Sequence, residues 1–511
     1  MLGGYVLAWT WACRRVHGAR SAKGPYPERV TNSINDRRDV LRDRVSRSIS
    51  KLAGGAIRGL DAPTQVISIV TADDQMPQRH ARLVIDLCLR AGEAMLATGA
   101  SAADVVATVL RVSNAYGVTG MHVDITFTSL TVSVHRGMNE DPMSVMRIVK
   151  VRTTDYSRLQ DVYVLIDEIT SAGSQLSVEE ARESLTSILT KPHPYRRWVV
   201  AAGKAVLAGG VVVMFDVSFV LVLIAAASAI LSDVITRRLG KLLVPAFFAQ
   251  IAAAMVTTSI AVFIFWLRSM GIELPGSNSP TVIVIAGIIT LLSGVGLTAS
   301  ARDAIDGYYV TATARGMEVV MLTLGLAVGI SIVLGAALRM GLPVTIGTSL
   351  GGDIGLVPGV VGSALIGVGF ALTSYVRFRY VPLMATVAGL VFAVYSVVLP
   401  LASQPGLAPG LAGIVAGIIG YLIYRWVKVP ESAMTMAGII GLIPGLAVYR
   451  SLYAFMDSAN GVTEALPAMV IALATGIGLA AGTTIGGFAA RRTFGLDRSA
   501  ILAGRRTRGA R

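Results

Sequence analysis

The sequence predicts a polytopic α-helical membrane protein with ten transmembrane helices, arranged as two inverted five-helix repeats and preceded by a small α+β cytoplasmic domain. Three observations lead to this prediction. The 511-residue chain is 53% hydrophobic and 15% charged, with a mean hydropathy of +0.65, which is typical of membrane proteins. Most of the charge lies before residue 196, and nearly all long apolar runs follow it. A glycine-containing motif also occurs twice within the apolar part.

Both ends of the chain are basic. Residues 1–75 are interpreted as a basic, mostly disordered leader, and residues 493–511 as a basic C-terminal tail. The net charge of +14 does not indicate nucleic-acid binding, because the positive residues gather in these ends and between apolar runs, where membrane topology and anionic lipid explain them. The cysteines, Cys13 and Cys88, form neither a disulfide framework nor a metal-type cluster, and no cofactor or metal is expected.

Residues 76–195 are predicted to form the α+β domain. Apolar residues recur at helical spacing over residues 79–98 and 101–117, with Ser101 as the second helix's N-cap and Asp104 completing a capping box. The period then changes to two around Ser129, which predicts two half-buried strands over residues 122–128 and 131–135. A third strand is expected near residues 145–151, followed by helices near 159–169 and 178–189.

This domain offers one constellation that an enzyme could use. His122 and Asp124 share a strand face, and His135 could join them from the next strand. A metal or hydrolytic site would need further ligands, and residues 76–195 contain no HExxH, GxSxG or Cys/His motif. The three residues are therefore interpreted as the polar face of a sheet, with a membrane-anchored enzyme as the alternative from a different functional class.

Ten apolar segments are long enough to cross a bilayer core of about 30 Å. If the α+β domain is cytoplasmic, alternate loops carry most of the arginine and lysine, which supports this count and places both termini in the cytoplasm. The predicted spans are Trp198–Phe215, Phe219–Thr236, Leu243–Leu267, Pro280–Ala299, Met317–Leu338, Leu356–Tyr375, Tyr380–Leu399, Gly410–Val427, Ser432–Val448 and Ala465–Ala490.

The repeated motif divides these spans into two units, residues 196–340 and 341–492. The first copy runs from Gly287 to Gly294 and the second from Gly438 to Gly445, and an aspartate, Asp306 or Asp457, follows each. Five spans per unit is an odd number, so the two units must insert in opposite directions. Inverted repeats with matched helix breaks are a sequence signature of secondary transporters.

The helix breaks predict the position of a substrate site. Pro444 lacks a backbone donor and Gly445 weakens a helix, and Ser293-Gly294 is a softer version in the first unit. Broken helices expose backbone groups that lipid cannot satisfy, so they are expected to line a polar cavity. Ordinary helix packing is the alternative interpretation of these residues.

Acidic residues near the spans are candidates for binding or proton coupling. Asp306 and Asp457 correspond between the repeats and are expected to bind or gate. Glu318 and Asp353 are proton-coupling candidates. Asp233 is expected to pair with Arg237 one turn away, and Asp303 is interpreted as a loop charge.

Several of these residues resemble the threonine/serine exporter family. Gly99-Ala100-Ser101 and the stretch from His122 to Thr126 are similar to its N-terminal domain. The segment from Arg302 to Gly307 and the stretch from Leu442 to Gly445 look like its two membrane motifs, although Ser293 stands where a proline is expected.

The resemblance implies a secondary exporter of L-threonine and L-serine in the bacterial inner membrane, driven by the proton motive force. Dicarboxylate export, known from split relatives, is the second transport hypothesis. The few basic residues within the spans favour a zwitterionic substrate over a dicarboxylate. The sequence implies small-molecule substrate, protons and lipid as partners and sets no oligomeric state.

Overall fold

The computed structural model describes most of the chain between residues 78 and 494. The predicted leader, most of the predicted C-terminal tail, and the candidate residues Ser293, Asp353, Pro444, Gly445 and Asp457 lie outside the described residues. The described residues are 78–135, 142–149, 153–171, 176–215, 218–272, 284, 286–287, 291, 294–342, 354–443, 447, 451, 454 and 461–494.

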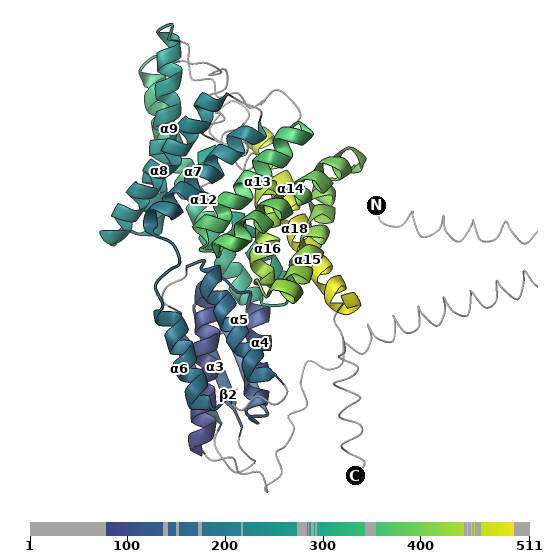
Figure 1. The fold of residues 1–511 in the computed structure, drawn as a ribbon. Coiled ribbons are helices and arrows are strands. Elements are labelled where there is room, and N and C mark those ends of the chain that lie inside the picture. Colours follow the sequence, from purple (N-terminus) through teal and green to yellow (C-terminus); the bar gives the residue numbers. More distant parts are fainter. Residues whose placement is uncertain are drawn as a thin grey trace, which may run out of the picture. The chain divides into compact units, whose positions relative to one another are not determined.

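The first described region combines four helices with a three-stranded antiparallel sheet (Figure 1). Helix α3 packs against β2 and β3, and α4 packs against β1. We refer to residues 78–195 as the N-terminal domain. Its elements are α3 (Gln78–Thr98), α4 (Ala102–Ala115), β1 (Met121–Thr126), β2 (Ser129–Val134), β3 (Met143–Ile148), α5 (Tyr156–Thr170) and α6 (Val178–Thr190).

Strands β1 and β2 form the hairpin that the period-two pattern predicts. Met121 pairs with Val134 and Thr126 with Ser129, which places the turn at residues 127–128. Ile125 and Leu130 are buried on the inner face, whereas His122 and Asp124 are exposed. The two half-buried strands and their inner face match the predicted alternation, which is a local property of the sequence. Ser129, around which the sequence predicts the strands to divide, is instead the first residue of β2.

Local caps fix the ends of two helices in this domain. Ser101 Oγ accepts a hydrogen bond from Asp104 N at 3.1 Å and donates to the Asp104 carboxylate at 2.7 Å, which confirms Ser101 as the N-cap of α4. A complete capping box joins Ser177 and Glu180 at α6. Cys88 is fully buried in α3, and burial raises the pKa of its thiol to about 12. It is therefore an unreactive core residue.

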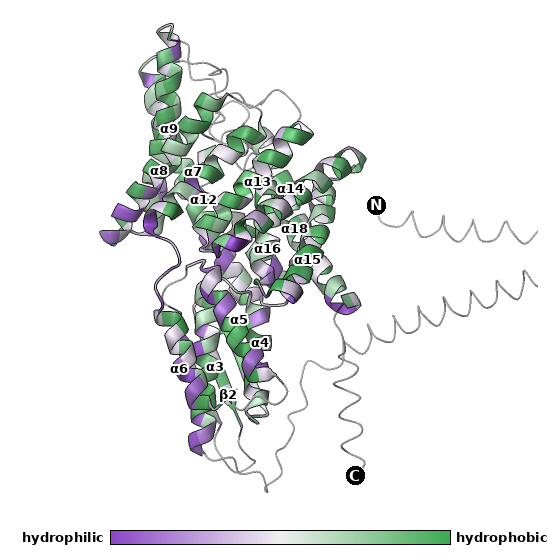
Figure 2. Ribbon diagram, in the orientation of Figure 1, coloured by the Kyte–Doolittle hydropathy of each residue, from purple (hydrophilic) through white to green (hydrophobic). Residues whose placement is uncertain are grey.

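Among the described residues, eight helices after the N-terminal domain are long and apolar enough to cross a membrane, so the protein is a polytopic helical membrane protein. Figure 2 shows that these helices consist mainly of hydrophobic residues, in contrast with the mixed polarity of α3–α6. These spans are α7 (Arg197–Met214), α8 (Phe219–Lys241), α9 (Ala246–Ser269), α12 (Tyr309–Arg339), α13 (Leu356–Thr373), Phe378–Leu401 around α14 (Val381–Val398), α15 (Leu407–Val427) and Ala465–Phe494 within α18 (Gly461–Phe494).

These helices coincide with eight of the ten predicted spans. The fourth and ninth predicted spans each include residues that are not described, so the count of ten remains a prediction. In the fourth, α11 (Gly294–Ile305) is described. In the ninth, α16 (Glu431–Ile439) continues as a short 3-10 turn, η3 (Ile440–Leu442).

Helices α7 and α13, the first of each predicted repeat, pack closely through glycines. A Cβ on Gly369 would lie 2.6 Å from the carbonyl oxygen of Gly203, and a Cβ on Gly210 would lie 2.9 Å from that of Gly362. Gly203 therefore faces Gly369 while Gly210 faces Gly362, which means that the two helices run antiparallel. Small residues permit such close backbone approach between membrane helices.

The third and fifth helices of each predicted repeat also pair through glycines. Gly325 and Gly329 of α12 contact the backbone of α9, at Phe247 and Ile251 respectively. In the second half, Gly478 and Gly482 of α18 contact the backbone of α15, at Gly406 and Gly410. Gly325/Gly329 and Gly478/Gly482 therefore have the same spacing in the sequence, and each pair makes the corresponding helix contact in its own half.

Candidate functional site

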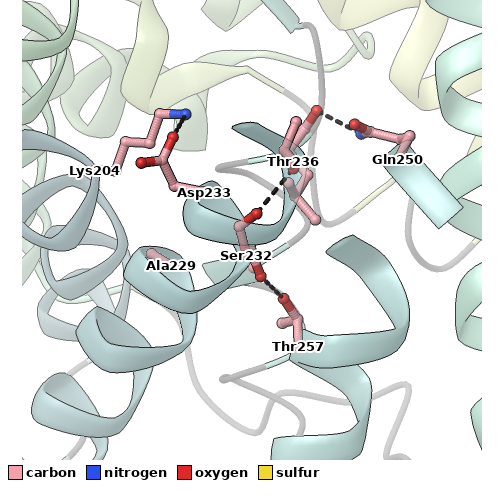
Figure 3. Close-up of a pocket in the computed structure, with 9 residues that line it drawn as sticks. Lys204, Ala229, Ser232, Asp233, Thr236, Gln250 and Thr257 are labelled. Atoms are coloured by element: carbon pink, nitrogen blue, oxygen red, sulfur yellow. Dashed lines mark hydrogen bonds and ion pairs between the residues drawn. The ribbon is translucent and has the colours of Figure 1, made fainter. Parts of the chain in front are cut away.

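A polar cavity of about 150 Å³ lies among α7, α8, α9 and the segment before α11 (Figure 3). We call it the polar cavity. Its walls combine one ion pair with hydroxyl and amide side chains, an unusual composition inside apolar helices. Its described lining residues are Lys204, Ala229, Ser232, Asp233, Thr236, Gln250, Thr257, Gly287 and Leu291.

The charged part of the cavity is a lysine–aspartate pair. Lys204 Nζ of α7 lies 2.5 Å from Asp233 Oδ1 of α8, and Asp233 also pairs with Arg237 one turn further on. The predicted Asp233–Arg237 pair is thus confirmed. The Asp233 side chain is only 4% exposed, whereas the Lys204 side chain is 35% exposed. A ligand entering the cavity can therefore reach Lys204 more readily than the carboxylate behind it.

Uncharged polar groups form the rest of the wall. Ser232 Oγ lies 3.0 Å from Thr257 Oγ1 and donates to the Ala253 carbonyl at 3.3 Å. Gln250 Nε2 of α9 donates to the Leu291 carbonyl at 2.8 Å (Figure 3). That bond satisfies a backbone acceptor in the segment just before α11, within the fourth predicted span. Side chains from neighbouring helices commonly compensate backbone groups that interrupted membrane helices leave free.

The first glycine of the repeated motif permits close packing beside the cavity. Gly287 is buried, and a Cβ at this position would overlap Thr257. Any larger residue at 287 would therefore displace the threonine that lines the cavity. The described part of helix α11 follows from Gly294, and the predicted break at Ser293 lies outside the described residues.

The second copy of the motif includes the end of the short 3-10 turn η3. After η3, Ile443 adopts an extended backbone conformation with φ −61° and ψ 133°. This conformation is the one that a following proline favours, and Pro444 is the next residue. Gly441 packs close to the buried Ser363 hydroxyl, at 2.8 Å from a hypothetical Cβ.

A second polar region, the charged cluster, surrounds the end of α11. Arg302 and Asp306 lie one turn apart at 3.9 Å, and Arg315 Nη1 lies 2.8 Å from Asp303 Oδ2. Asp303 is fully buried in α11 and also accepts a hydrogen bond from Ala102 N at 3.4 Å. Its interpretation as a loop charge is therefore wrong, because the N-terminal domain covers it.

Asp306 lies in the same cluster and is partly buried. Burial raises the pKa of its carboxyl above the usual value of 3.8, and Arg302 opposes that shift. Nearby, Arg491 Nη1 at the end of α18 pairs with Glu431 at the start of α16 at 2.7 Å. The charged cluster thus brings together helix ends from both halves of the membrane region.

The N-terminal domain contacts the membrane helices at several junctions. Thr311 Oγ1 donates to the Ile125 carbonyl at 3.1 Å, near the α11–α12 junction. Arg377, between α13 and α14, pairs with Asp161 at 2.5 Å, and Lys428, after α15, pairs with Asp167 at 2.8 Å. These three junctions belong to the alternate set of loops that the sequence predicts to be cytoplasmic.

Comparison with known proteins now identifies the family. A family model described as "Putative threonine/serine exporter" matches residues 86–337, and a second, described as "Threonine/Serine exporter, ThrE", matches residues 359–488. A Mycobacterium tuberculosis protein named "Probable threonine/serine exporter" is 35% identical over 413 residues, covering 79% of this chain and 76% of the relative. The chain belongs to the threonine/serine exporter family.

A second relative gives the same result. The "Threonine/serine exporter" of Corynebacterium glutamicum is 30% identical over 415 residues, covering 80% of this chain and 83% of its own length. No solved structure matches the chain. The resemblance seen in the sequence motifs is therefore confirmed at the level of the family, which is a family of transporters.

In this exporter, the structure places only part of the residue set predicted from sequence. Gly294 begins α11, and Asp306 lies just after its end, in the charged cluster. Glu318 lies on an exposed face of α12, three residues after Arg315 of the charged cluster, and is not among the described lining residues of the polar cavity. The functional roles predicted for these residues remain predictions.

Five polar residues of the polar cavity are not among the candidates predicted from sequence: Lys204, Ser232, Thr236, Gln250 and Thr257. Lys204 carries a usable signal, since it is a charged residue seven positions into an apolar span. Serine and threonine are common in membrane helices, so Ser232 and Thr257 carried no comparable signal.

The His122 constellation remains on the outer face of the sheet. The rings of His122 and His135 lie 6.1 Å apart, centroid to centroid, and Asp124 is exposed. Within the described ranges, no group of three or more His, Cys, Asp or Glu side chains could hold a metal ion.

Proposed function

We propose that this exporter moves L-threonine and L-serine out of the cytoplasm and is driven by the proton motive force. The observation that carries the proposal is the similarity to two proteins named as threonine/serine exporters, each over about four-fifths of the chain. Neither comparison supports the dicarboxylate or enzyme alternatives. A polar cavity between membrane helices is also a suitable environment for a small zwitterion.

The proposed architecture is an inverted repeat of residues 196–340 and 341–492. Two structural observations support it: the antiparallel packing of α7 on α13, and the matched glycine contacts of α9 with α12 and of α15 with α18. The two family matches also meet between residues 337 and 359, beside the proposed boundary. Such repeats allow alternating access by movement of one unit against the other.

The proposed orientation places the N-terminal domain and both termini in the cytoplasm. The positive charge of alternate loops supports it, as do the contacts of the N-terminal domain with the junctions around Thr311, Arg377 and Lys428. If the fourth and ninth spans cross the membrane, these junctions all lie on the cytoplasmic side.

Asp306 is the proposed proton-coupling or gating residue best supported by its surroundings. It lies between Arg302 and the acids of the charged cluster, and burial raises its pKa towards values at which proton uptake is easier. Its repeat partner Asp457 is proposed for the corresponding role. Ser293, Gly294, Pro444 and Gly445 are proposed to frame the substrate pathway, and Glu318 and Asp353 remain further proton-coupling candidates.

The proposal is tested by efflux from cells. Cells preloaded with a threonine-containing dipeptide should release threonine faster when they express the protein, and an uncoupler should abolish the difference. Unchanged threonine and serine efflux, with the protein shown to be in the membrane, would overturn the proposed substrates. Faster efflux that resists the uncoupler would overturn the proposed driving force.

A further inference from the structure

We propose that the polar cavity is the amino-acid binding site, in which Lys204 binds the α-carboxylate of the substrate and the Ser232–Thr257 hydroxyl pair recognises its side-chain hydroxyl. This inference rests on the proposed function and adds the residues that would recognise the substrate. Asp233 acts as a positioning residue, because its buried carboxylate pairs with the Lys204 ammonium.

The ion pair supplies the charge for this recognition. An ammonium carries three hydrogen-bond donors, so the 2.5 Å contact of Lys204 with Asp233 leaves donors for a ligand. The Lys204 side chain is 35% exposed, so a ligand can reach these donors, whereas the Asp233 side chain is only 4% exposed. Because Arg237 pairs with the same carboxylate, the group of Lys204, Asp233 and Arg237 carries a net charge of +1, which suits the α-carboxylate of a substrate.

The hydroxyl wall supplies selectivity. Ser232 and Thr257 are 2% exposed and lie 3.0 Å apart, so their hydroxyls form a fixed donor–acceptor pair at the cavity surface. A ligand hydroxyl can join this pair. A ligand without one would leave the polar wall unmatched, and sites built around a hydroxyl discriminate against such analogues.

The size of the cavity limits the side chain. Its volume of about 150 Å³ corresponds to roughly five water molecules at ~30 Å³ each, so a small amino acid fits and an aromatic one does not. A larger cavity of about 620 Å³ lies between α9 and α12, but its described lining is mainly apolar, with Phe263 and Trp266 among it, and includes no charged side chain. It offers a zwitterion no ionic partner.

The cavity also adjoins an element that could respond to binding. Leu291, whose carbonyl accepts from Gln250, lies just before α11, and α11 leads to Asp306 in the charged cluster. Twelve helical residues span about 18 Å at 1.5 Å per residue.

The test measures ligand discrimination by the purified full-length protein in lipid nanodiscs. Three ligands are compared: L-threonine, L-threoninol, which has CH2OH in place of the carboxylate, and L-2-aminobutyrate, which lacks the hydroxyl. The wild-type protein should bind L-threonine roughly ten- to hundredfold more tightly than L-threoninol, the range expected for a charge-assisted hydrogen bond. Lys204→Met should bring that ratio close to one, whereas Lys241→Met, at the exposed end of α8, should leave it unchanged.

A second pair of variants isolates the hydroxyl wall. Thr257→Val should reduce the preference for L-threonine over L-2-aminobutyrate by roughly threefold to tenfold. Thr258→Val is its control. Thr258 is equally buried and, like Thr257, donates to a carbonyl of its own helix, but it is not among the described lining residues of the cavity.

The outcomes separate the two proposals. If the wild-type protein binds neither threonine nor serine, the proposed substrate class is wrong. If it binds threonine and Lys204→Met keeps the full preference for a carboxylate, the cavity assignment is wrong. Should Lys204→Met misfold because Asp233 is left without its partner, the double variant Lys204→Met/Asp233→Asn carries the same test, and Lys204→Arg should retain part of the preference.

Discussion

The buried carboxylate of Asp303 accepts a hydrogen bond from the backbone N–H of Ala102, 201 residues earlier in the chain, at 3.4 Å. Ala102 is the first residue of α4, so a carboxylate of the membrane region caps a helix of the N-terminal domain. Helix N-termini favour a negative charge at this position. Since Asp303 also pairs with Arg315, the end of α11 and the start of α12 are tied to the N-terminal domain through one side chain.

Replacing Asp303 should therefore weaken this attachment. Asp303→Asn leaves Arg315, only 14% exposed, without its ionic partner, and breaking a buried pair costs about 3–5 kcal/mol. We expect a thermal unfolding midpoint several degrees lower for the purified protein. The matched control is Asp167→Asn, which removes the more exposed pair with Lys428 and should cost about 1 kcal/mol or less. Equal midpoints for the two variants would contradict the role of Asp303.

The pH dependence of stability should report on Asp306. Its pKa is raised in the folded protein, so the folded state holds this proton more tightly than the unfolded state. Its contribution to stability is therefore greatest below the unfolded pKa of 3.8 and decreases as the pH rises through the folded pKa. Asp306→Asn should remove this decrease in a series of unfolding midpoints from pH about 3 to about 7. A curve parallel to that of the wild type would argue against the shift.

Transport should depend on the predicted acids. Asp306→Asn and Asp457→Asn should each reduce threonine efflux without reducing the amount of protein in the membrane. Glu318→Gln tests the exposed position on α12, where the sequence predicts proton coupling and the structure shows no contact with the charged cluster among the described residues. Full activity in all three variants would refute the acid assignments.

The α7–α13 interface should tolerate no added side chain. Gly369→Ala would place a Cβ 2.6 Å from Gly203 O and Leu207 N, and overpacking typically costs about 1–3 kcal/mol. We expect lower stability and less transport. Gly335→Ala in α12 is the control, because its Cβ would meet nothing within 4 Å, and it should be neutral or slightly stabilising. The two variants are compared by unfolding midpoint and efflux rate.

The predictions that succeeded rest on local patterns. The hairpin of β1 and β2 follows from strict alternation, the cap at Ser101 from a side chain beside its own helix, and the eight spans from runs of apolar residues. The end of η3 just before Pro444 follows from a residue that interrupts helices wherever it occurs, whereas the break predicted at Ser293-Gly294 stays a prediction.

The features that escaped prediction depend on tertiary contacts. Asp303 is buried because a domain far away in sequence covers it. Lys204 pairs with Asp233 only because α7 and α8 pack with these faces towards each other. Gln250 of α9 donates to the Leu291 carbonyl, which belongs to the segment before α11. No local pattern specifies such rotations, although a lysine inside an apolar span is by itself a reason to look for a partner.

The most direct measurement is threonine efflux from proteoliposomes that contain the purified protein. The vesicles are loaded with labelled L-threonine, and an outside-acid pH gradient is imposed. We expect the gradient to accelerate efflux from wild-type vesicles, a protonophore to remove the acceleration, and Lys204→Met to reduce efflux while Lys241→Met does not. Efflux at the rate of protein-free vesicles, with the reconstituted protein shown to be folded, would contradict proton-driven export by this chain.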